Sequence, residues 1–465
     1  MSRRPNILLI CTDQQRYDSL GVNGNTICRT GNIDRLAAEG MNFTHAFTVC
    51  SLCSPARASL MTGLYPHRHG VIDNTNARDV LQRDLREDAV TFSQLLRNSG
   101  YRTGYVGKWH VGKDKTPLDW GFDDFVPGEG WHEWYPDGVT LENGSDIGLA
   151  YAPEKPMAAR VPLPLEKYPE YNRTSDAVDL LGKYAEGENP FFMRLDFFGP
   201  HYPHYLPDPY ATMYEASGIP PWPNAKAIPD IAHAGEQWLR HRWPAPDDNW
   251  PACAQLIAYY YGHVTFIDHQ VGRVLEAVDR LGLAENTLVI FVSDHGDMTG
   301  AHGLLQKGAV SYDELYKIPL VMRWPGKIEA GSTSDEMVRL FDLMPTFLES
   351  ARAAVPSNLD ACSLVPLLGG DPPTDWPNHV FAEYLGTQRG DTALKIVRTR
   401  NHKLSVNLTE IDELYDLDSD PGESLNRIHD PTCQEIRHTL SNQLMAWMEQ
   451  SHDPMATRFS ERLSL

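Results

Sequence analysis

The sequence predicts an α/β protein with a large, mixed and mostly parallel sheet flanked by helices, followed by a smaller C-terminal antiparallel sheet plus a helix. Two short apolar runs, Ile7 to Ile10 and Leu288 to Val292, are typical of buried parallel strands. Between them, helical patterns alternate with strand patterns, as in a doubly wound sheet. Because 465 residues are many for one hydrophobic core, we expect a large domain over residues 1–355 and a subdomain over residues 356–465.

Local patterns indicate the elements between the two apolar runs. We expect a helix around Val90 to Ser99, a strand from Arg102 to Val106 and another strand from Pro190 to Phe197. The Pro- and Trp-rich stretch from about Tyr205 to Pro251 is expected to be an irregular surface excursion. A long helix should then run from Cys253 to about Leu281.

After Pro356 the pattern changes to short strand-like runs separated by turns. These runs predict the antiparallel sheet, and a helix from about Cys433 to Gln450 closes the chain. The expected strands are Val380 to Tyr384, Leu394 to Thr399, His402 to Asn407 and Glu413 to Leu417.

Composition excludes several classes of partner. The net charge of −21 argues against nucleic acid or an anionic membrane surface. Seven sparse cysteines do not make a disulfide framework. The chain has neither a signal-peptide core nor an apolar run of about 18 residues that would span a bilayer. We therefore expect a cytoplasmic protein without a membrane partner.

The segment from Cys53 to Gly63 carries the strongest chemical signal. Pro55 can occupy the first position of a helix that Gly63 ends, which leaves Cys53 just before the helix N-terminus. The unpaired N–H groups and the helix dipole there attract anions, and Arg57 can add a forked donor one turn later. This pattern predicts an anion site with a nucleophile in it; the alternative is an inert buried cysteine.

Acidic residues follow two of the expected strands. Asp13 ends the first apolar run, and Asp294 and His295 end the second. Since reactive groups of parallel sheets gather beyond the carboxyl ends of the strands, these residues should lie together. Two carboxylates beside an anion-binding helix indicate a hard divalent cation that bridges protein and substrate oxygens. Asp297 is expected to be an exposed turn carboxylate instead.

These motifs resemble the sulfatase family of the alkaline phosphatase superfamily. Residues 53–63 match its signature, Cys-x-Pro/Ala-x-Arg followed by x-x-x-Leu/Met-Thr-Gly. The resemblance covers nearly the whole chain. Further matching segments are Thr30 to Ala37 (with Gly31 in place of the usual Pro), Gly107-Lys108-Trp109-His110, Pro200-His201-Tyr202-Pro203, Lys307 to Leu320, and Glu413 to Pro421.

The resemblance implies two additions to the chain. A formylglycine-generating enzyme would convert Cys53 to formylglycine, whose hydrate offers one hydroxyl as nucleophile and a second to expel sulfate. One divalent cation would be held by Asp13, Gln14, the Cys53 product, Asp294 and His295. Many sulfatases have Asp-Asp and Asp-Asn in the two metal loops, whereas this chain has Asp-Gln and Asp-His. The imidazole ligand favours manganese more than a carboxylate would, and magnesium is a further candidate. Calcium still ranks first, because it is the usual metal of the family that the chain resembles.

The resemblance also assigns roles to basic residues around this centre. Arg57 should stabilise the nucleophile and bind a substrate oxygen. Lys108, His201 and Lys307 should hold the sulfate oxygens, and His201 or Lys307 should protonate the leaving oxygen. His110 should accept a proton when the intermediate collapses. Asp294 is expected to take the proton of the attacking hydroxyl. Asn74 is expected to bind the diol or the substrate.

The resulting hypothesis is hydrolysis of small-molecule sulfate monoesters, aryl or small organic, of the arylsulfatase type. The rival is a phosphonate monoester or phosphodiester hydrolase, a relative with the same nucleophile and metal loops but without the Gly-Lys-Trp-His motif. An anion-binding protein with unmodified Cys53 is the minor alternative. A homodimer through the exposed C-terminal sheet is expected. The aromatic residues that could line a leaving-group pocket, or only pack loops onto the body, are Trp131, Trp134, Tyr135, Trp222 and Trp243.

Overall fold

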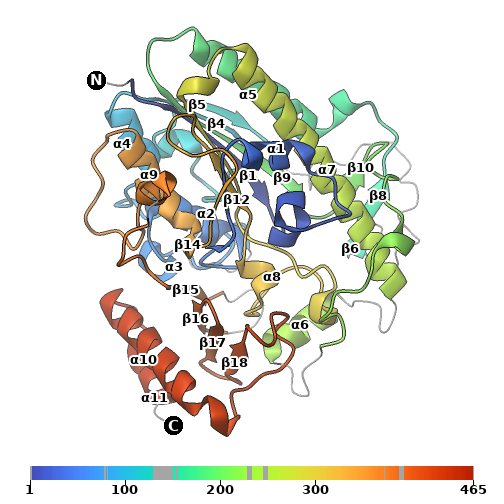
Figure 1. Cartoon of the computed structure of the whole chain (residues 1–465), viewed down its shortest axis with the longest axis vertical. Helices are drawn as coiled ribbons and strands as arrows, with labels where there is room; N and C mark the ends of the chain where they lie inside the picture. Colours follow the sequence, from blue (N-terminus) through green and yellow to red (C-terminus); the bar gives the residue numbers. More distant parts are fainter. Residues whose placement is uncertain are drawn as a thin grey trace.

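The large sheet forms the centre of the molecule (Figure 1). The computed structural model describes residues 3–77, 80, 82–128, 150–152, 155–227, 233–243, 250–370, 372–386 and 392–463. Within these ranges the sheet is mixed and mostly parallel, as predicted, because only β12 runs against its neighbours. Its eight strands, from edge to edge, are β13 (Ser332–Ser334), β2 (Met41–Phe43), β12 (Leu320–Arg323), β11 (Thr287–Ser293), β1 (Asn6–Asp13), β9 (Phe191–Pro200), β4 (Arg102–Gly107) and β5 (Asp124–Pro127).

Strand β1 is buried along its whole length, which explains its uninterrupted apolar run. Leu8 and Ile10 point to a core shared with α1 (Gly31–Ala38), α5 (Pro169–Ala185) and α7 (Trp250–Arg280). The alternate residues Ile7 and Leu9 point to the opposite core. That core is shared with α2 (Cys53–Thr62), α4 (Phe92–Asn98) and α9 (Leu343–Ser350). Helices therefore cover both faces of the sheet.

The C-terminal sheet is antiparallel, with strands in chain order, and lies at one end of the molecule (Figure 1). One face packs against the main body and the other against two closing helices. The predicted elements are confirmed to within a residue. They are β15 (His379–Tyr384), β16 (Leu394–Thr399), β17 (His402–Asn407), β18 (Glu413–Asp416) and α10 (Gln434–Gln450), followed by α11 (Ala456–Leu463). The boundary at residue 355 stays a prediction.

The stretch after Tyr205 is more regular than the sequence predicts. It contains β10 (His204–Leu206) and α6 (Ala234–Arg242), and α7 already begins at Trp250. The ring of His233 accepts the Glu236 N–H at 3.4 Å and so caps α6. The Pro and Trp content of the stretch does not indicate this helix start. Trp131, Trp134 and Tyr135 lie outside the described residues. The remaining short elements are β3 (Ala46–Phe47), β6 (Ala150–Ala152), β7 (Lys155–Pro156), β8 (Ala158–Arg160), β14 (Val338–Arg339), α3 (Pro66–His69) and α8 (Asp313–Tyr316).

None of the helices in the described ranges combines the length and apolar character that a bilayer crossing requires.

Gly107, the last residue of β4, has a φ of +103°. A Cβ there would lie 2.0 Å from the carbonyl oxygen of Asp196 on the neighbouring strand. Only glycine therefore lets the chain turn out of β4 and carry Lys108 to the carboxyl edge of the sheet.

We predict that Gly107→Ala lowers the free energy of unfolding by at least about 2 kcal/mol, because it combines a strained backbone with a clash against backbone. Gly182→Ala is the matched control, since Gly182 lies inside α5 with nothing within 4 Å of a Cβ. That change should stabilise the chain by roughly 0.5–1 kcal/mol. Urea unfolding measures both variants, and equal stability of the two would contradict this reading of β4.

Candidate active site

The register of the central strands brings the two acidic loops together. β1 and β11 are parallel neighbours with Thr12 paired to Ser293, so Asp13 and Asp294 leave the sheet side by side. The Asp294 Oδ1 atom accepts the backbone N–H of Gln14 at 3.1 Å and that of His295 at 2.9 Å. The predicted meeting of the two loops at the carboxyl edge is confirmed.

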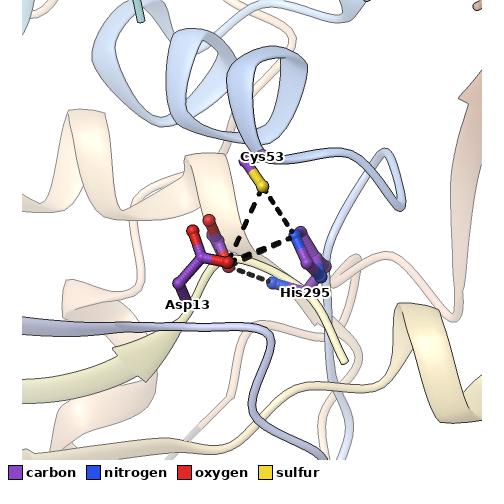
Figure 2. A group of neighbouring side chains, drawn as sticks. Asp13, Cys53 and His295 are labelled. Atoms are coloured by element: carbon purple, nitrogen blue, oxygen red, sulfur yellow. Dashed lines mark hydrogen bonds and ion pairs between the residues drawn. The ribbon is translucent and has the colours of Figure 1, made fainter. Parts of the chain in front are cut away.

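Helix α2 delivers Cys53 to the same edge (Figure 2). The helix begins at Cys53 itself, not at Pro55 as predicted, and ends at Gly63, whose φ is +69°. Its N-cap residue offers no side-chain hydrogen bond. Instead the side-chain oxygen of Asn74 accepts the Ser54 N–H at 3.1 Å. Asn74 therefore caps the helix beside Cys53 from a separate segment.

Three charged or polar groups surround the Cys53 sulfur. Lys307 Nζ lies 2.7 Å from Sγ. His295 Nε2 lies 3.3 Å and Asp13 Oδ1 3.7 Å from it (Figure 2). The other ring nitrogen of His295, Nδ1, lies 2.9 Å from the Gly296 carbonyl oxygen. When Nδ1–H donates this bond, Nε2 is left with its lone pair facing Cys53, as a metal ligand requires.

The pKa of the Cys53 thiol is held well below its usual range. Burial and the Asp13 carboxylate oppose ionisation, but Lys108, Lys307 and His295 outweigh them. An inert buried cysteine would have a raised pKa, as that of Cys50 is. The surroundings of Cys53 are therefore those of a reactive position.

The donor set suits a divalent cation. Candidate ligand atoms of Asp13, Cys53, Asp294 and His295 all lie within 4.8 Å of one another. The side-chain oxygen of Gln14 is buried without a hydrogen-bond partner, which is costly unless a further group such as a cation satisfies it. Burial and the Asp13 carboxylate raise the pKa of Asp294 to about 6, a sign of negative charge that the side chains alone do not balance.

Arg57 lies beneath the acidic loops with its side chain fully buried. Its guanidinium contacts Asp294 at 2.8 Å, Asp13 at 3.2 Å and Asp196 at 3.4 Å, and it donates to the Lys108 carbonyl at 3.2 Å. This position suits a group that orients the carboxylates. The expected contact of Arg57 with a substrate oxygen stays a prediction.

The remaining basic residues also lie at this edge. Lys108, directly after β4, makes an ion pair with Asp13 Oδ2, and its backbone N–H donates to the Asp196 carbonyl at 3.1 Å. His201 directly follows β9, and burial together with Lys307 holds its pKa well below the usual range. Burial likewise lowers the pKa of His110. The charge of Lys108 lowers this pKa further, whereas Cys53 raises it. Lys108, His110 and His201 therefore lie near Cys53 or the carboxylates around it.

Sequence reasoning missed three residues of this site. Asp297 is buried, not exposed, and pairs with the side-chain amide of Gln14. Gln306 accepts the same amide at 2.9 Å. Asp196 is buried within β9 between Arg57 and Arg194. For Asp196 the available signal was a charged pair, Arg194 and Asp196, inside a strand that is otherwise mostly apolar. Nothing in the turn sequence distinguishes a buried Asp297.

We predict that Arg57→Leu costs about 3–5 kcal/mol of unfolding free energy in metal-free protein, because three buried carboxylates lose their shared cation. Arg57→Lys should lower the unfolding free energy less, since lysine keeps the positive charge and loses only the paired N–H donors of the guanidinium. Arg83→Leu is the control, because Arg83 is half exposed in a surface ion pair. Denaturant unfolding checks the order, and an Arg57→Leu protein as stable as the control would contradict it.

Comparison with known proteins agrees with this geometry. The model of the family described as "Sulfatase" matches residues 5–353. A second model, "N-sulphoglucosamine sulphohydrolase, C-terminal", matches residues 300–450. The chain is 31% identical to the uncharacterized sulfatase YidJ of Escherichia coli K12, over 97% of this chain and 88% of that protein. It is 29% identical to an arylsulfatase of Clostridium perfringens, over 93% and 92% of the two chains.

A solved structure extends the comparison. The phosphonate monoester hydrolase of Agrobacterium radiobacter matches with a TM-score of 0.79 and 26% identity, over 96% of both chains. The fold is therefore that of the alkaline-phosphatase-like sulfatases, and the relatives include sulfatases as well as a phosphonate monoester hydrolase. On the family model and on its identity to YidJ, the chain belongs to the sulfatase family.

Proposed function

We propose that this chain hydrolyses sulfate monoesters of phenols or small organic alcohols, after conversion of Cys53 to formylglycine by a formylglycine-generating enzyme. Family membership supports hydrolysis of sulfate esters and of related phosphonates. The observation that carries the proposal is the position of Cys53 Sγ, at the start of α2 and within 4 Å of Lys307, His295 and Asp13.

The two additions to the chain each supply one kind of chemistry. The hydrate of formylglycine supplies a hydroxyl that attacks sulfur and a second one whose deprotonation releases sulfate. A divalent cation held by Asp13, Gln14, Asp294 and His295 would offset the negative charge of the substrate oxygens. Calcium is our first choice, with manganese or magnesium as alternatives. Every other step falls to side chains of this chain.

Lys108 and Lys307 provide fixed positive charge for the sulfate oxygens. The low pKa of His201 keeps its ring neutral near pH 7, so Lys307, already in contact with the nucleophile position, is the better donor to the leaving oxygen. His110 is also neutral there, because burial lowers its pKa. It can accept the proton of the second hydroxyl.

The rival function is hydrolysis of phosphonate monoesters or phosphodiesters. The relative from Agrobacterium radiobacter gives this function weight. Against it stand Lys108 and His110, because the family resemblance implies that the rival lacks the Gly-Lys-Trp-His motif. Lys108 lies against Asp13, where a terminal sulfate would bring its negative charge.

We predict faster turnover of p-nitrophenyl sulfate than of p-nitrophenyl phenylphosphonate by the fully modified protein. Lys108→Ser should lower kcat/KM for the sulfate about 10²–10³-fold, as loss of one charge-stabilising donor does, and should lower it less for the phosphonate. Side-by-side kinetics at one pH measures both. If fully modified protein of the native sequence cleaves the phosphonate faster than the sulfate, phosphonate hydrolysis becomes the favoured function.

Peptide mass spectrometry of residue 53 accompanies these assays. It separates an enzyme from an anion-binding protein with an unconverted thiol. Hydrolysis should rise in proportion to the fraction of formylglycine, and Cys53→Ala should abolish it. Full activity in protein whose Cys53 is unconverted would sink the formylglycine mechanism.

A further inference from the structure

The first metal loop, residues 13–16, turns at Gln14 in a backbone conformation that few residues other than glycine adopt. Gln14 is fully buried and has a φ of +66°, in the left-handed region. Such a conformation is strained and persists only where the surrounding contacts hold it in place. The contacts around Gln14 therefore decide where its side chain, a proposed ligand of the cation, can lie.

A single hydroxyl group, that of Tyr260, bridges the backbone of this turn. It donates to the Gln14 carbonyl oxygen at 3.1 Å and accepts the backbone N–H of Arg16 at 2.8 Å. A phenol is protonated near neutral pH, so it can donate one bond while it accepts another. The Tyr260 hydroxyl thus joins the backbone on both sides of Gln15 and holds the turn closed.

Tyr260 belongs to α7, a helix of 31 residues that supplies none of the residues proposed for catalysis. It is 1% exposed and lies in an apolar cluster with Ile257 and Val264 of the same helix and with Ile219. Because this packing fixes the ring, the hydroxyl is presented to the first metal loop from a rigid part of the fold.

The side chain of Gln14 is oriented by the segment that follows β11. Its amide nitrogen donates to the Asp297 carboxylate and to the Gln306 side-chain oxygen, the latter at 2.9 Å. Both N–H donors of the amide are then used, which fixes the amide oxygen on the opposite side. Among the described residues this oxygen, Oε1, is buried without a hydrogen-bond partner. A turn that shifted Gln14 would break these contacts and move the oxygen that a cation could use.

We propose that Tyr260 is a positioning residue for the divalent cation, because its hydroxyl holds the turn that keeps the Gln14 oxygen at the metal site. The inference rests on the proposed function, which places a cation there. Tyr260 supplies no ligand atom itself and acts through the backbone of residues 14 and 16. Without the hydroxyl, the Gln14 carbonyl and the Arg16 N–H lose a buried partner and the strained turn relaxes, so the ion loses one oxygen ligand.

The first test removes the hydroxyl and keeps the ring. Tyr260→Phe should raise the Kd of the full chain for calcium and for manganese about 10–100-fold, the usual effect of losing a group that orients a metal ligand. Isothermal titration calorimetry of chelator-stripped protein measures this, with equal formylglycine fractions in all variants. Tyr261→Phe is the matched control, since Tyr261 is the next buried residue of α7 and its hydroxyl accepts the Asn25 side-chain amide at 3.2 Å instead. That variant should bind both ions like the native sequence.

A second pair of variants separates positioning from a general loss of structure. In a Gln14→Ala background, where the ligand oxygen is already gone, Tyr260→Phe should change the Kd by no more than roughly twofold. An equally large weakening in both backgrounds would mean that Tyr260 does not act through Gln14, and would overturn the inference. Equal affinity of Tyr260→Phe and the native sequence would also overturn it, but would leave the proposed metal site standing. Native protein that binds neither ion would overturn both.

Discussion

The site depends on a single buried cation, the Arg57 guanidinium, which contacts three carboxylates at once. Asp13, Asp196 and Asp294 lie in or directly after three adjacent strands, and Arg57 is the cation that contacts all three and reduces their mutual repulsion. Cys53 and Arg57 are four residues apart on α2, so they share one face of the helix. The same helix therefore presents the nucleophile position and fixes the carboxylates that face it, which sets the geometry of the metal site before any metal is bound.

The C-terminal sheet contributes to this geometry through the loop that carries Lys307. Asp313, six residues further on, is held by Lys403 of β17 at 3.1 Å and by Arg398 of β16 at 3.0 Å. The Ser311 hydroxyl donates to Glu413 of β18 at 2.7 Å. Because these buried contacts hold the loop from one side, the small sheet supports the position of Lys307 beside Cys53 and also covers the body.

Much of the fold and the site could be predicted where a local pattern has one physical cause. The apolar runs of β1 and β11 are buried on both faces, and the spacing of Cys53, Arg57 and Gly63 follows from one helix. What failed depends on tertiary contacts. The helix starts at Cys53 because Asn74, from a distant segment, satisfies its free N–H. Asp297 is buried because the Gln14 amide meets it, a contact between two loops that no local pattern contains.

We propose that one divalent cation is held jointly by Asp13, Asp294, His295 and position 53. Metal analysis by mass spectrometry, after stripping with a chelator and re-addition of calcium or manganese, tests it most directly. We expect one ion per chain in the native sequence, and its loss in Asp294→Asn protein that is still folded by circular dichroism. A folded native chain that retains no ion, or an Asp294→Asn chain that keeps it, would rule out a metal site at these residues.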